Sequence, residues 1–549
     1  MARNPNPFRL SDLAACAAWS CLGAALVIHG CASPASTRER SARAPRDREP
    51  AHGLASASSA ASTPAPSAPP APPAPAPNGP AVEAPAVPAA PVFAERPSLP
   101  ASEPDVRIRI AALRSREPVV KVTSPSGSMR MQGAGLAPRA LRSPVEARQV
   151  AAGWRVTESA GTPGARAWDV GLAGAIEFVP ASPGGSLRFG ELECPGTVRA
   201  VPVADAPGAI DVVADVPMED YLPGVVAKEL YRDWGIEAFR AQAIAARSFA
   251  VCEHAHWSTR RHYDVVAGEA SQAWAGAVKD AKPREAAAST RGMVLAYEGR
   301  VVPAYYSSTC GGTPATAVES ITRNPNHDIP PLARAEGGAP GADPCCSTAK
   351  HYRWKQDFAN TDVCAQLRRW AAEQLAPPDA ERAHSIEAEF GTDAPLAELS
   401  RLRRITSVDV SAVNAAGRPS RLRLVDQDGR AIDMRAEEFR RAIAFAPEGQ
   451  PAPKERLRSS HLVRASVQGD RIRFEGHGYG HGAGMCQHGA QALAVSGRSA
   501  AQILSTYYPG STVVRAYGPG SQPVAPPVQA SRHVHRNRRA PGRRRRAAA

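Results

Sequence analysis

The stretch GIEAFRAQAIAARSFAVCEHA, residues 235–255, is the clearest helical segment in the chain. Its apolar and small side chains recur at helical spacing and form one stripe: Ile236, Phe239, Ala243, Ala246 and Ala250. Asp233 or Gly235 is suited to cap the first turn. The spacing therefore predicts a helix over this stretch.

Strands are expected before this helix, and mixed elements after it. Before it, short apolar stretches alternate with Gly, Pro and Asp over 106–122 and 167–216. After it, the pattern predicts a strand that enters a glycine turn at 300–312, helices within 360–400, and strands at 402–413, 422–433 and 470–476. Residues 489–510 are typical of two helices separated by Gly497. Strands and helices in mixed order, without repeated βαβ units, indicate an α+β fold.

The N-terminus has the layout of an export signal. Arg3 and Arg9 precede an apolar run from Leu13 to Ile28, which is too short to span a membrane comfortably. The run ends at a Gly-Cys pair that resembles the cleavage box of bacterial lipoproteins, with Cys31 as the lipidated residue. His29 is unusual in such a box, so secretion without lipid and an uncleaved anchor stay open. We expect residues 1–31 to direct export to the periplasmic side of the cell envelope, with a lipid anchor.

Residues 32–104 and 518–549 are predicted to be disordered. The first segment has 14 prolines between residues 51 and 100, and it cannot bury enough apolar surface to offset its conformational entropy. As a tether of polyproline character it would reach on the order of 200 Å. The second segment contributes eight arginines to the formal net charge of +14. Such a tail solubilises the chain or attracts anionic envelope polymers, and the export signal ranks nucleic acid last as a partner.

Seven of the ten cysteines lie beyond the export segment. They are Cys194, Cys252, Cys310, Cys345, Cys346, Cys364 and Cys486. In an oxidising envelope they are candidates for disulfides, and their odd number leaves one free or bound to metal. The sequence alone does not define their pairing.

Three separated stretches resemble, in the same order, the motifs of the SpoIID/LytB family of peptidoglycan-acting proteins. They are VPMEDYLPGVVAKEL with the helical stretch after it, VVPAYYSSTCGGTP, and GHGYGHGAGMCQHGA with its two predicted helices, and they begin at residues 216, 301 and 476. The resemblance covers residues 105–517. We expect a β-rich part at 105–216, a catalytic-helix part at 217–319, an insertion-prone part at 320–460, and the glycine-histidine loop with C-terminal helices at 461–517.

The resemblance implies one of two activities. Sporulation-type members are lytic transglycosylases that cleave glycan strands, notably strands without stem peptides, whereas LytB-type members are described as enhancers of a partner amidase. We expect the first activity, in which bonds between MurNAc and GlcNAc are cleaved to give 1,6-anhydro-MurNAc ends. A non-catalytic, glycan-binding activator of a cell-wall amidase is the alternative, and a structural wall anchor is a third interpretation. No cofactor is expected.

The family's catalytic acid is a Glu at the end of the phrase VVxxE, and Glu229 occupies that position. A protonated Glu can donate its proton to the leaving glycosidic oxygen. The resulting carboxylate can then take the proton of the muramic acid C6 hydroxyl as it closes on C1. This role needs a raised pKa, which an apolar setting made by Val225, Val226 and Leu230 would give.

Further substrate contacts are implied for the helix at 235–255. Gln242 and Arg247 match the family pattern AQAxAAR, and a Gln side chain suits sugar hydroxyl or acetamido groups. Arg247 would orient the catalytic Glu or bind a lactyl carboxylate. A structural salt bridge is the alternative for Arg247. Glu219, the nearest rival carboxylate, is expected to be structural.

The glycine-histidine loop, residues 477–490, allows two interpretations. It contains four residues of zinc-ligand type: His477, His481, Cys486 and His488. Their spacing is not a common zinc pattern, and the resemblance covers His481 and Gln487 but not all four residues. The glycines fit a backbone that approaches a ligand or adopts positive φ. We therefore predict a substrate-cleft loop in which His481 and Gln487 face the glycan, together with Ser308 of the preceding motif.

A second metal question concerns Cys310. Some sporulation-type members bind zinc through a Cys at this position and a His shortly after it, but here the next His is His327. We expect Cys310 to form a disulfide with Cys345 or Cys346, whose surroundings DPCCSTAKHYRW also resemble the family. Zinc is the second choice, and His481 and Cys486 are weaker candidates as ligands.

Overall fold

A computed structural model describes residues 95–521, except 205, 269–270, 334–344, 377–390, 448–449 and 451. These residues belong to one compact unit, Pro88–Ala549. The predicted export segment with Cys31, most of the predicted tether and nearly all of the basic tail lie outside the described residues. Within the described part of the chain, no helix combines the length and apolar character needed to cross a membrane.

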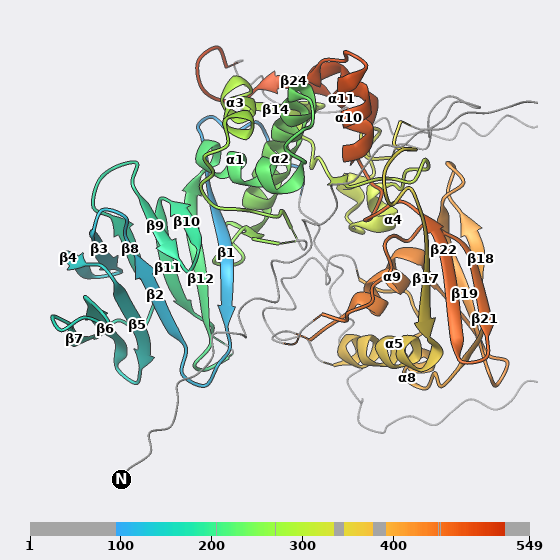
Figure 1. The fold of residues 1–549 in the computed structure, drawn as a ribbon, viewed down its shortest axis with the longest axis horizontal. Coiled ribbons are helices and arrows are strands. Elements are labelled where there is room, and N and C mark those ends of the chain that lie inside the picture. The colour runs from blue at the N-terminus through green and yellow to red at the C-terminus, as the bar shows by residue number, and fades with distance from the viewer. Residues whose placement is uncertain are drawn as a thin grey trace, which may run out of the picture. The chain divides into compact units, whose positions relative to one another are not determined.

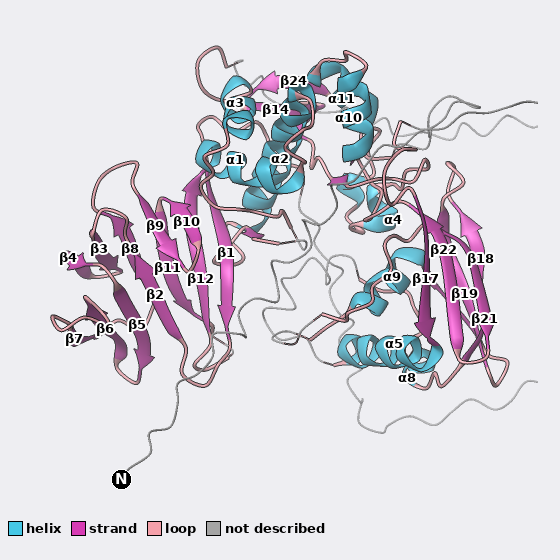
Figure 2. Cartoon of the chain, in the orientation of Figure 1, coloured by secondary structure: helices cyan, strands magenta, loops and turns pink. Residues whose placement is uncertain are grey.

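Two packed sheets make up the β-rich part that precedes the helices (Figures 1 and 2). One has the strand order β13-β1-β12-β11-β8-β3-β4, and the other has β10-β9-β2-β5-β6-β7. Strand β12 lies between β1 and β11 and is buried from Ile210 to Ala214. The strands are β1 Asp105–Leu113, β2 Val119–Thr123, β3 Ser128–Gly133, β4 Leu136–Arg142, β5 Val145–Val150, β6 Gly153–Glu158, β7 Arg166–Val170, β8 Ile176–Pro180, β9 Ser186–Phe189, β10 Leu192–Pro195, β11 Thr197–Pro202, β12 Ile210–Pro217 and β13 Val265–Val266.

Helix α2, Ile236–Trp257, organises the helical layer. It contacts α1 Met218–Glu229, α3 Ala281–Ser289, α10 Gln487–Val495 and α11 Ala500–Tyr507. Most side chains between Ala238 and Cys252 are buried, and many are alanines that let the neighbouring helices approach closely. Four helices therefore meet around the stretch that gave the clearest helical pattern, and the N-cap is Gly235.

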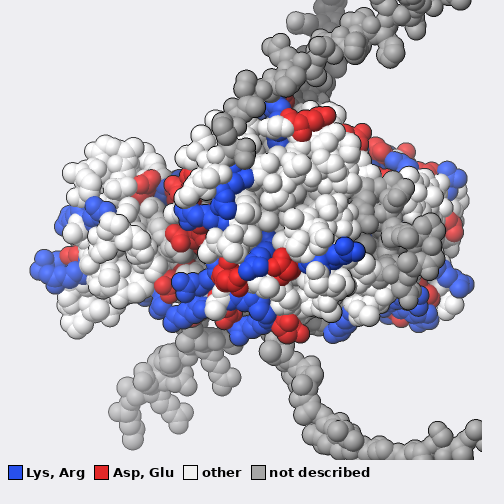
Figure 3. Space-filling view, turned by 90° about the horizontal axis from the view of Figure 1, so that it is seen from above, with Lys and Arg blue, Asp and Glu red and all other residues white. Residues whose placement is uncertain are grey.

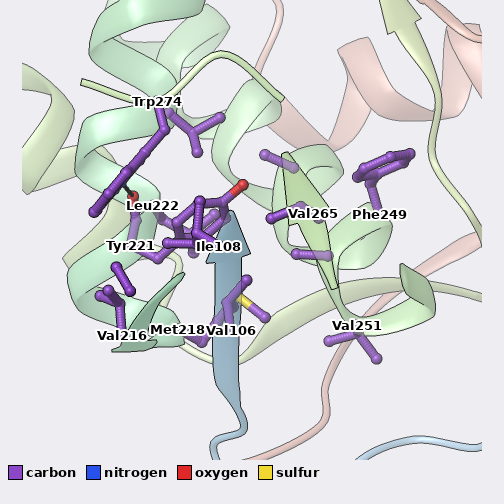
Figure 4. Close-up of a cluster of buried hydrophobic side chains, with 14 of the residues drawn as sticks. Val106, Ile108, Val216, Met218, Tyr221, Leu222, Phe249, Val251, Val265 and Trp274 are labelled. Carbon is purple, nitrogen blue, oxygen red and sulfur yellow. Dashed lines mark hydrogen bonds between the residues drawn. The ribbon is translucent and has the colours of Figure 1, made fainter. Parts of the chain in front are cut away.

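The helices share an apolar core with the sheet through β1. Figure 4 shows Val106 and Ile108 of β1 beside Met218, Tyr221 and other side chains of α1. The indole nitrogen of Trp274 donates a hydrogen bond to the Tyr221 carbonyl at 3.1 Å. This packing fixes the direction of α1, whose last residue is Glu229.

Residues 353–477 have a second apolar core. It lies among the sheets β17-β22-β21 and β18-β19-β20, with α5 and α9 packed against them. The elements are β17 Arg353–Ala359, α5 Asn360–Leu375, α8 Leu396–Ser400, β18 Ile405–Val413, β19 Pro419–Asp426, β20 Ala431–Arg435, α9 Ala436–Ala444, β21 Leu462–Gln468 and β22 Arg471–His477. Strand β17 lies before residue 460 and its partner β22 lies after it. The second core therefore extends beyond residue 460, where the insertion-prone part was expected to end.

Short elements bring the two glycine-rich motifs together. Strand β16, Tyr306–Ser307, pairs in parallel with β23, Met485–Cys486, so that Ser307 lies opposite Cys486. An isolated bridge between Thr309 and Tyr479 extends this contact. The remaining elements are β14 Met293–Tyr297, β15 Arg300–Val301, α4 Ala317–Ser320, the 3-10 helix Pro325–His327, and β24 Thr512–Arg515.

The α+β class is confirmed, and so are the helix at 235–255 and the helix pair after the glycine-histidine loop. The single strand expected at 422–433 is wrong. The chain turns between β19 and β20, where the Asp426 carboxylate accepts from the N–H groups of Asp428 and Arg430, and Gly429 has a φ of 77°. The strand expected at 300–312 is limited to the two-residue strands β15 and β16.

The predicted tether was placed too far along the chain. Arg96 is only 7% exposed, and its guanidinium donates to the Tyr297 carbonyl at 3.0 Å. The Arg291 guanidinium donates to the carboxylate of Glu103. Residues from about 95 therefore belong to the folded body, because polar anchors hold a segment whose composition alone suggested a linker.

A buried ion pair joins α1 to α2. Arg247 donates to the Glu219 carboxylate at 2.7 and 2.9 Å, and the two side chains are 0% and 8% exposed. Burial alone would raise the pKa of Glu219, but Arg247, with the Tyr517 hydroxyl and the Gly292 N–H, lowers it. The Arg247 guanidinium also donates to the Met293 carbonyl at 3.0 Å. Arg247 thus forms the structural salt bridge, and its expected contact with substrate is not supported.

Loss of Arg247 should destabilise the fold strongly. Arg247→Met leaves the Glu219 carboxylate buried without its cation, and we expect a loss of about 3–5 kcal/mol in the free energy of unfolding. The matched control is Arg155→Met, because the Arg155–Asp169 pair is more than half exposed and should contribute at most about 1 kcal/mol. Urea denaturation of both variants measures the difference. A loss for Arg247→Met as small as that of the control would contradict this account.

Candidate functional site

Glu229 and Gln487 meet although they are 258 positions apart in the sequence. The Gln487 amide nitrogen donates to one carboxylate oxygen of Glu229 at 3.0 Å, and the Ala273 N–H donates to the other at 3.1 Å. Glu229 is half-buried and Gln487 is buried. The two residues that the sequence assigned to acid chemistry and to glycan contact therefore form one site.

Two helix ends place these side chains. Helix α1 ends at Glu229 because Leu230 adopts an extended conformation. Helix α10 begins at Gln487, and the Cys486 sulfur caps it by accepting from the Gly489 N–H at 3.4 Å. Both helices pack on α2, so the geometry of the site follows from the packing of three helices.

Gln272 connects two tyrosines near Glu229, of which Tyr221 is buried and Tyr306 is half-buried. The Tyr221 hydroxyl donates to the Gln272 carbonyl oxygen at 2.8 Å, and the Gln272 amide nitrogen donates to the Tyr306 hydroxyl at 2.9 Å. Burial raises the pKa of both tyrosines well above the usual range, and the charge of Glu229 raises it further. Both phenols therefore stay neutral, and their polar network borders the carboxylate. Sequence analysis missed Gln272, which lies in a loop between α2 and α3.

The setting of Glu229 differs from the apolar one that was expected. Val225, Val226 and Leu230 are buried in apolar clusters. The carboxylate oxygens of Glu229 instead accept hydrogen bonds from Gln487 and Ala273.

The ring nitrogens of His481 are engaged within the loop. Nε2 donates to the Tyr306 carbonyl at 2.8 Å, and Nδ1 accepts from the Ala483 N–H at 3.1 Å. Burial lowers the pKa of His481 to about 4, so the ring is neutral near pH 7. His481 thus holds the glycine-histidine loop against β16, in place of the expected contact with glycan or metal.

Two further side chains, Gln242 and Ser308, were predicted to contact the glycan. Gln242 is fully buried on α2, and neither polar atom of its amide has a hydrogen-bond partner. A glycan cannot reach such a side chain in this conformation. Ser308 is half-buried, and its carbonyl accepts from the His488 N–H at 3.1 Å, which ties the β16 turn to α10.

A group of aromatic rings includes neighbours in sequence of both Glu229 and Gln487. Tyr231 is 60% exposed, and its ring centroid is 5.3 Å from that of Trp234 and 6.1 Å from that of His488. The rings of Trp234 and His488 meet edge to face at 5.0 Å. Because His488 follows Gln487 directly and Tyr231 lies two residues after Glu229, this aromatic group adjoins the site.

The glycines of the loop have the role expected of them. Gly478, Gly480, Gly482 and Gly484 all have positive φ, between 67° and 96°. A Cβ on Gly484 would lie 1.9 Å from the Tyr305 carbonyl oxygen, and one on Gly482 would meet the Arg418 guanidinium at 2.8 Å. The backbone therefore packs too closely for side chains at these points.

Arg418 holds both glycine-rich motifs, and sequence analysis missed it. Its buried guanidinium donates to the carbonyls of Cys310 and Thr313 at 3.0 Å and to the His481 carbonyl at 3.3 Å. It also donates to the Ser460 hydroxyl at 3.2 Å. Arg418 lies at the end of the turn between β18 and β19. The apolar side chains of both strands pack in the second core, so that core helps to shape the site.

Three cysteines come together beside α10. The sulfur atoms of Cys310, Cys346 and Cys486 lie within 4.8 Å of one another, and the Cys310 and Cys346 sulfurs are 3.8 Å apart. Hydrogen bonds among the three thiols lower the pKa of Cys346 and raise those of Cys310 and Cys486. The expected disulfide is not formed among the described cysteines, which are all free, and Cys345 is exposed and outside the group. Of the four possible zinc ligands in the glycine-histidine loop, Cys486 alone belongs to this group of three cysteines.

Comparison with known proteins finds a family model and several relatives. Residues 206–297, which include Glu229, match the family model SpoIID, described as stage II sporulation protein. The chain is 25% identical to the amidase enhancer of Bacillus subtilis, over 53% of this chain and 40% of that protein. It is 24% identical to stage II sporulation protein D of Bacillus amyloliquefaciens, over 55% of this chain and 76% of that protein. An uncharacterised protein of Brachyspira hyodysenteriae is 25% identical over 59% of this chain and 73% of its own length. The chain is thus similar to the SpoIID family model over residues 206–297, and to an amidase enhancer and a stage II sporulation protein D over slightly more than half of its length.

His481 should make stability depend on pH. Its folded pKa of about 4 lies below the ordinary value of 6.5, so the unfolded chain takes up a proton at higher pH than the folded chain does. The stability that this difference contributes is complete above pH 6.5 and is lost as the pH falls towards 4. We expect His481→Asn to lose less free energy of unfolding than the wild type between about pH 7 and about pH 5. Chemical denaturation at the two pH values measures this, and equal losses would show that His481 titrates normally.

Proposed function

We propose that this protein is a lytic transglycosylase of the bacterial cell wall. Its substrate is the bond between MurNAc and GlcNAc in peptidoglycan, in strands poor in stem peptides, and its products end in 1,6-anhydro-MurNAc. The observation that carries the proposal is the half-buried Glu229 carboxyl, held by the Gln487 amide and the Ala273 N–H beside an exposed aromatic ring.

Glu229 acts first as acid and then as base. The protonated carboxyl gives its proton to the leaving glycosidic oxygen as positive charge develops at C1. The carboxylate then takes the proton from the C6 hydroxyl, whose oxygen closes on C1. Atoms balance without water, because the proton that Glu229 loses in the first step returns to it in the second.

Gln487 suits both protonation states of Glu229. Its NH₂ group donates to the carboxylate, which is the arrangement observed. After rotation of the amide, its carbonyl oxygen can accept from the protonated carboxyl. The Ala273 N–H holds the other carboxylate oxygen in place. Gln487 is therefore a positioning residue that can hydrogen-bond to Glu229 both when the carboxyl is protonated and when it is ionised.

A single carboxyl group suffices for ring closure, whereas ordinary glycoside hydrolysis uses two. Glu219, the other glutamate of α1, does not serve as the second one. It is paired with Arg247 and also accepts from Tyr517 and Gly292. This arrangement favours the transglycosylase reaction over hydrolysis.

Tyr231 is proposed to bind a sugar ring. Its side chain is 60% exposed and lies against Trp234 and His488, which limit its motion. An exposed, supported aromatic ring offers an apolar face to the C–H groups of a sugar at low entropic cost. Glu229 is two residues away, so a sugar stacked on Tyr231 would lie near the acid.

Charge on the face shown in Figure 3 fits a glycan better than nucleic acid. Figure 3 shows Lys and Arg interspersed with Asp and Glu, with a broad uncharged area among them. A nucleic-acid partner would favour a surface of one sign. We place the protein in the envelope on the periplasmic side, anchored through lipid on Cys31, with peptidoglycan as its partner.

The second candidate function is activation of a cell-wall amidase. It is favoured by the similarity to a protein named amidase enhancer, although the chain covers 40% of that relative's length. In this case the same site would bind glycan without cleaving it. The two functions differ in whether purified strands are cut when no amidase is present.

Replacement of the acid should abolish turnover and leave binding intact. Glu229→Gln keeps the size of the side chain but cannot transfer a proton, and we expect a fall of about 10²–10⁴-fold in kcat. Affinity for peptide-free glycan strands should stay within about threefold, since the amide keeps the hydrogen-bonding shape. Asp220→Asn is the control, because it makes the same change at an exposed position of α1. Cleavage by Glu229→Gln at the wild-type rate would exclude Glu229 as the acid.

Removal of the exposed ring should weaken binding. We expect Tyr231→Ala to raise KM for glycan strands by about 10-fold, in keeping with about 1–1.5 kcal/mol for a lost aromatic contact, while kcat changes little. Tyr231→Phe keeps the ring and should retain the KM of the wild type. Steady-state kinetics on strands of defined length measures both constants. An unchanged KM for Tyr231→Ala would show that the ring does not contact the glycan.

A further inference from the structure

Three thiols from distant parts of the chain converge on one point. Cys310 lies in the turn after β16, Cys346 in the loop before β17, and Cys486 at the junction of β23 and α10. Their sulfur atoms lie within 4.8 Å of one another. Cys346 and Cys486 are 2% exposed and Cys310 is half-buried. The proposed glycan chemistry uses none of these thiols.

The spacing of the sulfurs fits metal ligands better than a disulfide. Zn²⁺ binds thiolates at about 2.3 Å in tetrahedral geometry, which places neighbouring sulfurs roughly 3.8 Å apart. The Cys310 and Cys346 sulfurs are 3.8 Å apart. A disulfide would require a distance of about 2.0 Å between the Cys310 and Cys346 sulfurs. It would leave the thiol of Cys486 buried beside the bond.

Backbone N–H groups point at one of these sulfurs. The Cys486 sulfur accepts from the Cys310 N–H at 3.5 Å and from the Gly489 N–H at 3.4 Å. Cys486 also lies at the N-terminus of α10, where the helix dipole favours negative charge. N–H donors and a helix N-terminus both stabilise thiolate, which is the form that binds metal.

We propose that Cys310, Cys346 and Cys486 bind one Zn²⁺ ion through three thiolates. This donor set differs from the Cys–His pair implied by the family resemblance, because His327, the next histidine after Cys310, bonds the Tyr305 hydroxyl through Nδ1 at 3.0 Å. Among the described Cys, His, Asp and Glu residues, no other side chain shares the cluster, so water or an external group takes the fourth position. Binding releases thiol protons to solvent and needs no oxidant.

The metal would act on the glycan site through position alone. Cys486 precedes Gln487, whose amide holds Glu229, and Cys310 lies in the turn that Arg418 anchors. A bound ion would therefore fix the start of α10 relative to the β16 turn. No step of the proposed glycan reaction is assigned to the ion, and its occupancy does not depend on whether glycan is cleaved.

The test is metal binding by the full chain, purified without oxygen. We expect about one zinc per chain in the wild type, and a thiolate-to-metal charge-transfer band when Co²⁺ replaces it. Cys310→Ser, Cys346→Ser and Cys486→Ser should each weaken zinc binding by about 100-fold or more. Cys345→Ser is the matched control, because it removes the adjacent, exposed thiol outside the cluster and should bind zinc as the wild type does.

A measurement on the wild type alone guards against variants that fail to fold. Added zinc should protect Cys310, Cys346 and Cys486 from alkylation and leave Cys345 reactive, as read by peptide mass mapping. Chelation should lower the melting temperature. A wild-type chain with intact thiols that binds neither Zn²⁺ nor Co²⁺ would overturn the proposal. So would a Cys310–Cys346 disulfide in protein isolated from cells.

Discussion

The hydrogen bond between Gln487 and Glu229 joins the end of α1 to the start of α10, and the site depends on it. The two helices reach this point because both pack on α2, whose many alanines allow close approach. The Arg247–Glu219 ion pair fixes α1 on α2 from the other end of α1. The Glu229 carboxylate is thereby held between the Gln487 amide and the Ala273 N–H.

The opposite side of the site is a pair of glycine-rich turns held by buried polar groups. Arg418 bonds carbonyls in both turns, and His481 bonds the Tyr306 carbonyl. Arg418 lies in the turn between β18 and β19, whose apolar side chains pack in the second core, so residues 353–477 contribute to the site. A loop that must bend at four glycines gains its single conformation from these contacts, because glycine itself specifies none.

Local pattern predicted the elements that depend on neighbours in sequence. The periodicity of residues 235–255 gave α2, and Gly497 separated α10 from α11. The family phrase selected Glu229 and Gln487, which the fold brings together. These features could be read because each lies within one short segment.

Contacts between distant segments could not be read in this way. The sequence allowed Arg247 either a role at the substrate site or a structural salt bridge, and only the fold shows Glu219 beside it. Arg418 and Gln272 belong to segments without a recognised motif, and their roles arise only from carbonyls and hydroxyls supplied elsewhere. The cysteines were expected to form a pair, whereas the fold adds Cys486 as a third member.

The chemical nature of the product ends tests the central claim most directly. Peptide-free glycan strands are incubated with the wild-type protein, and the new ends are analysed by mass spectrometry. Ring closure under Glu229 predicts muramic ends that each lack one water relative to a hydrolytic product. Ordinary reducing ends would contradict transglycosylation. If the strands stay intact and the protein instead accelerates an added amidase, the protein is an amidase activator and the enzymatic account is wrong.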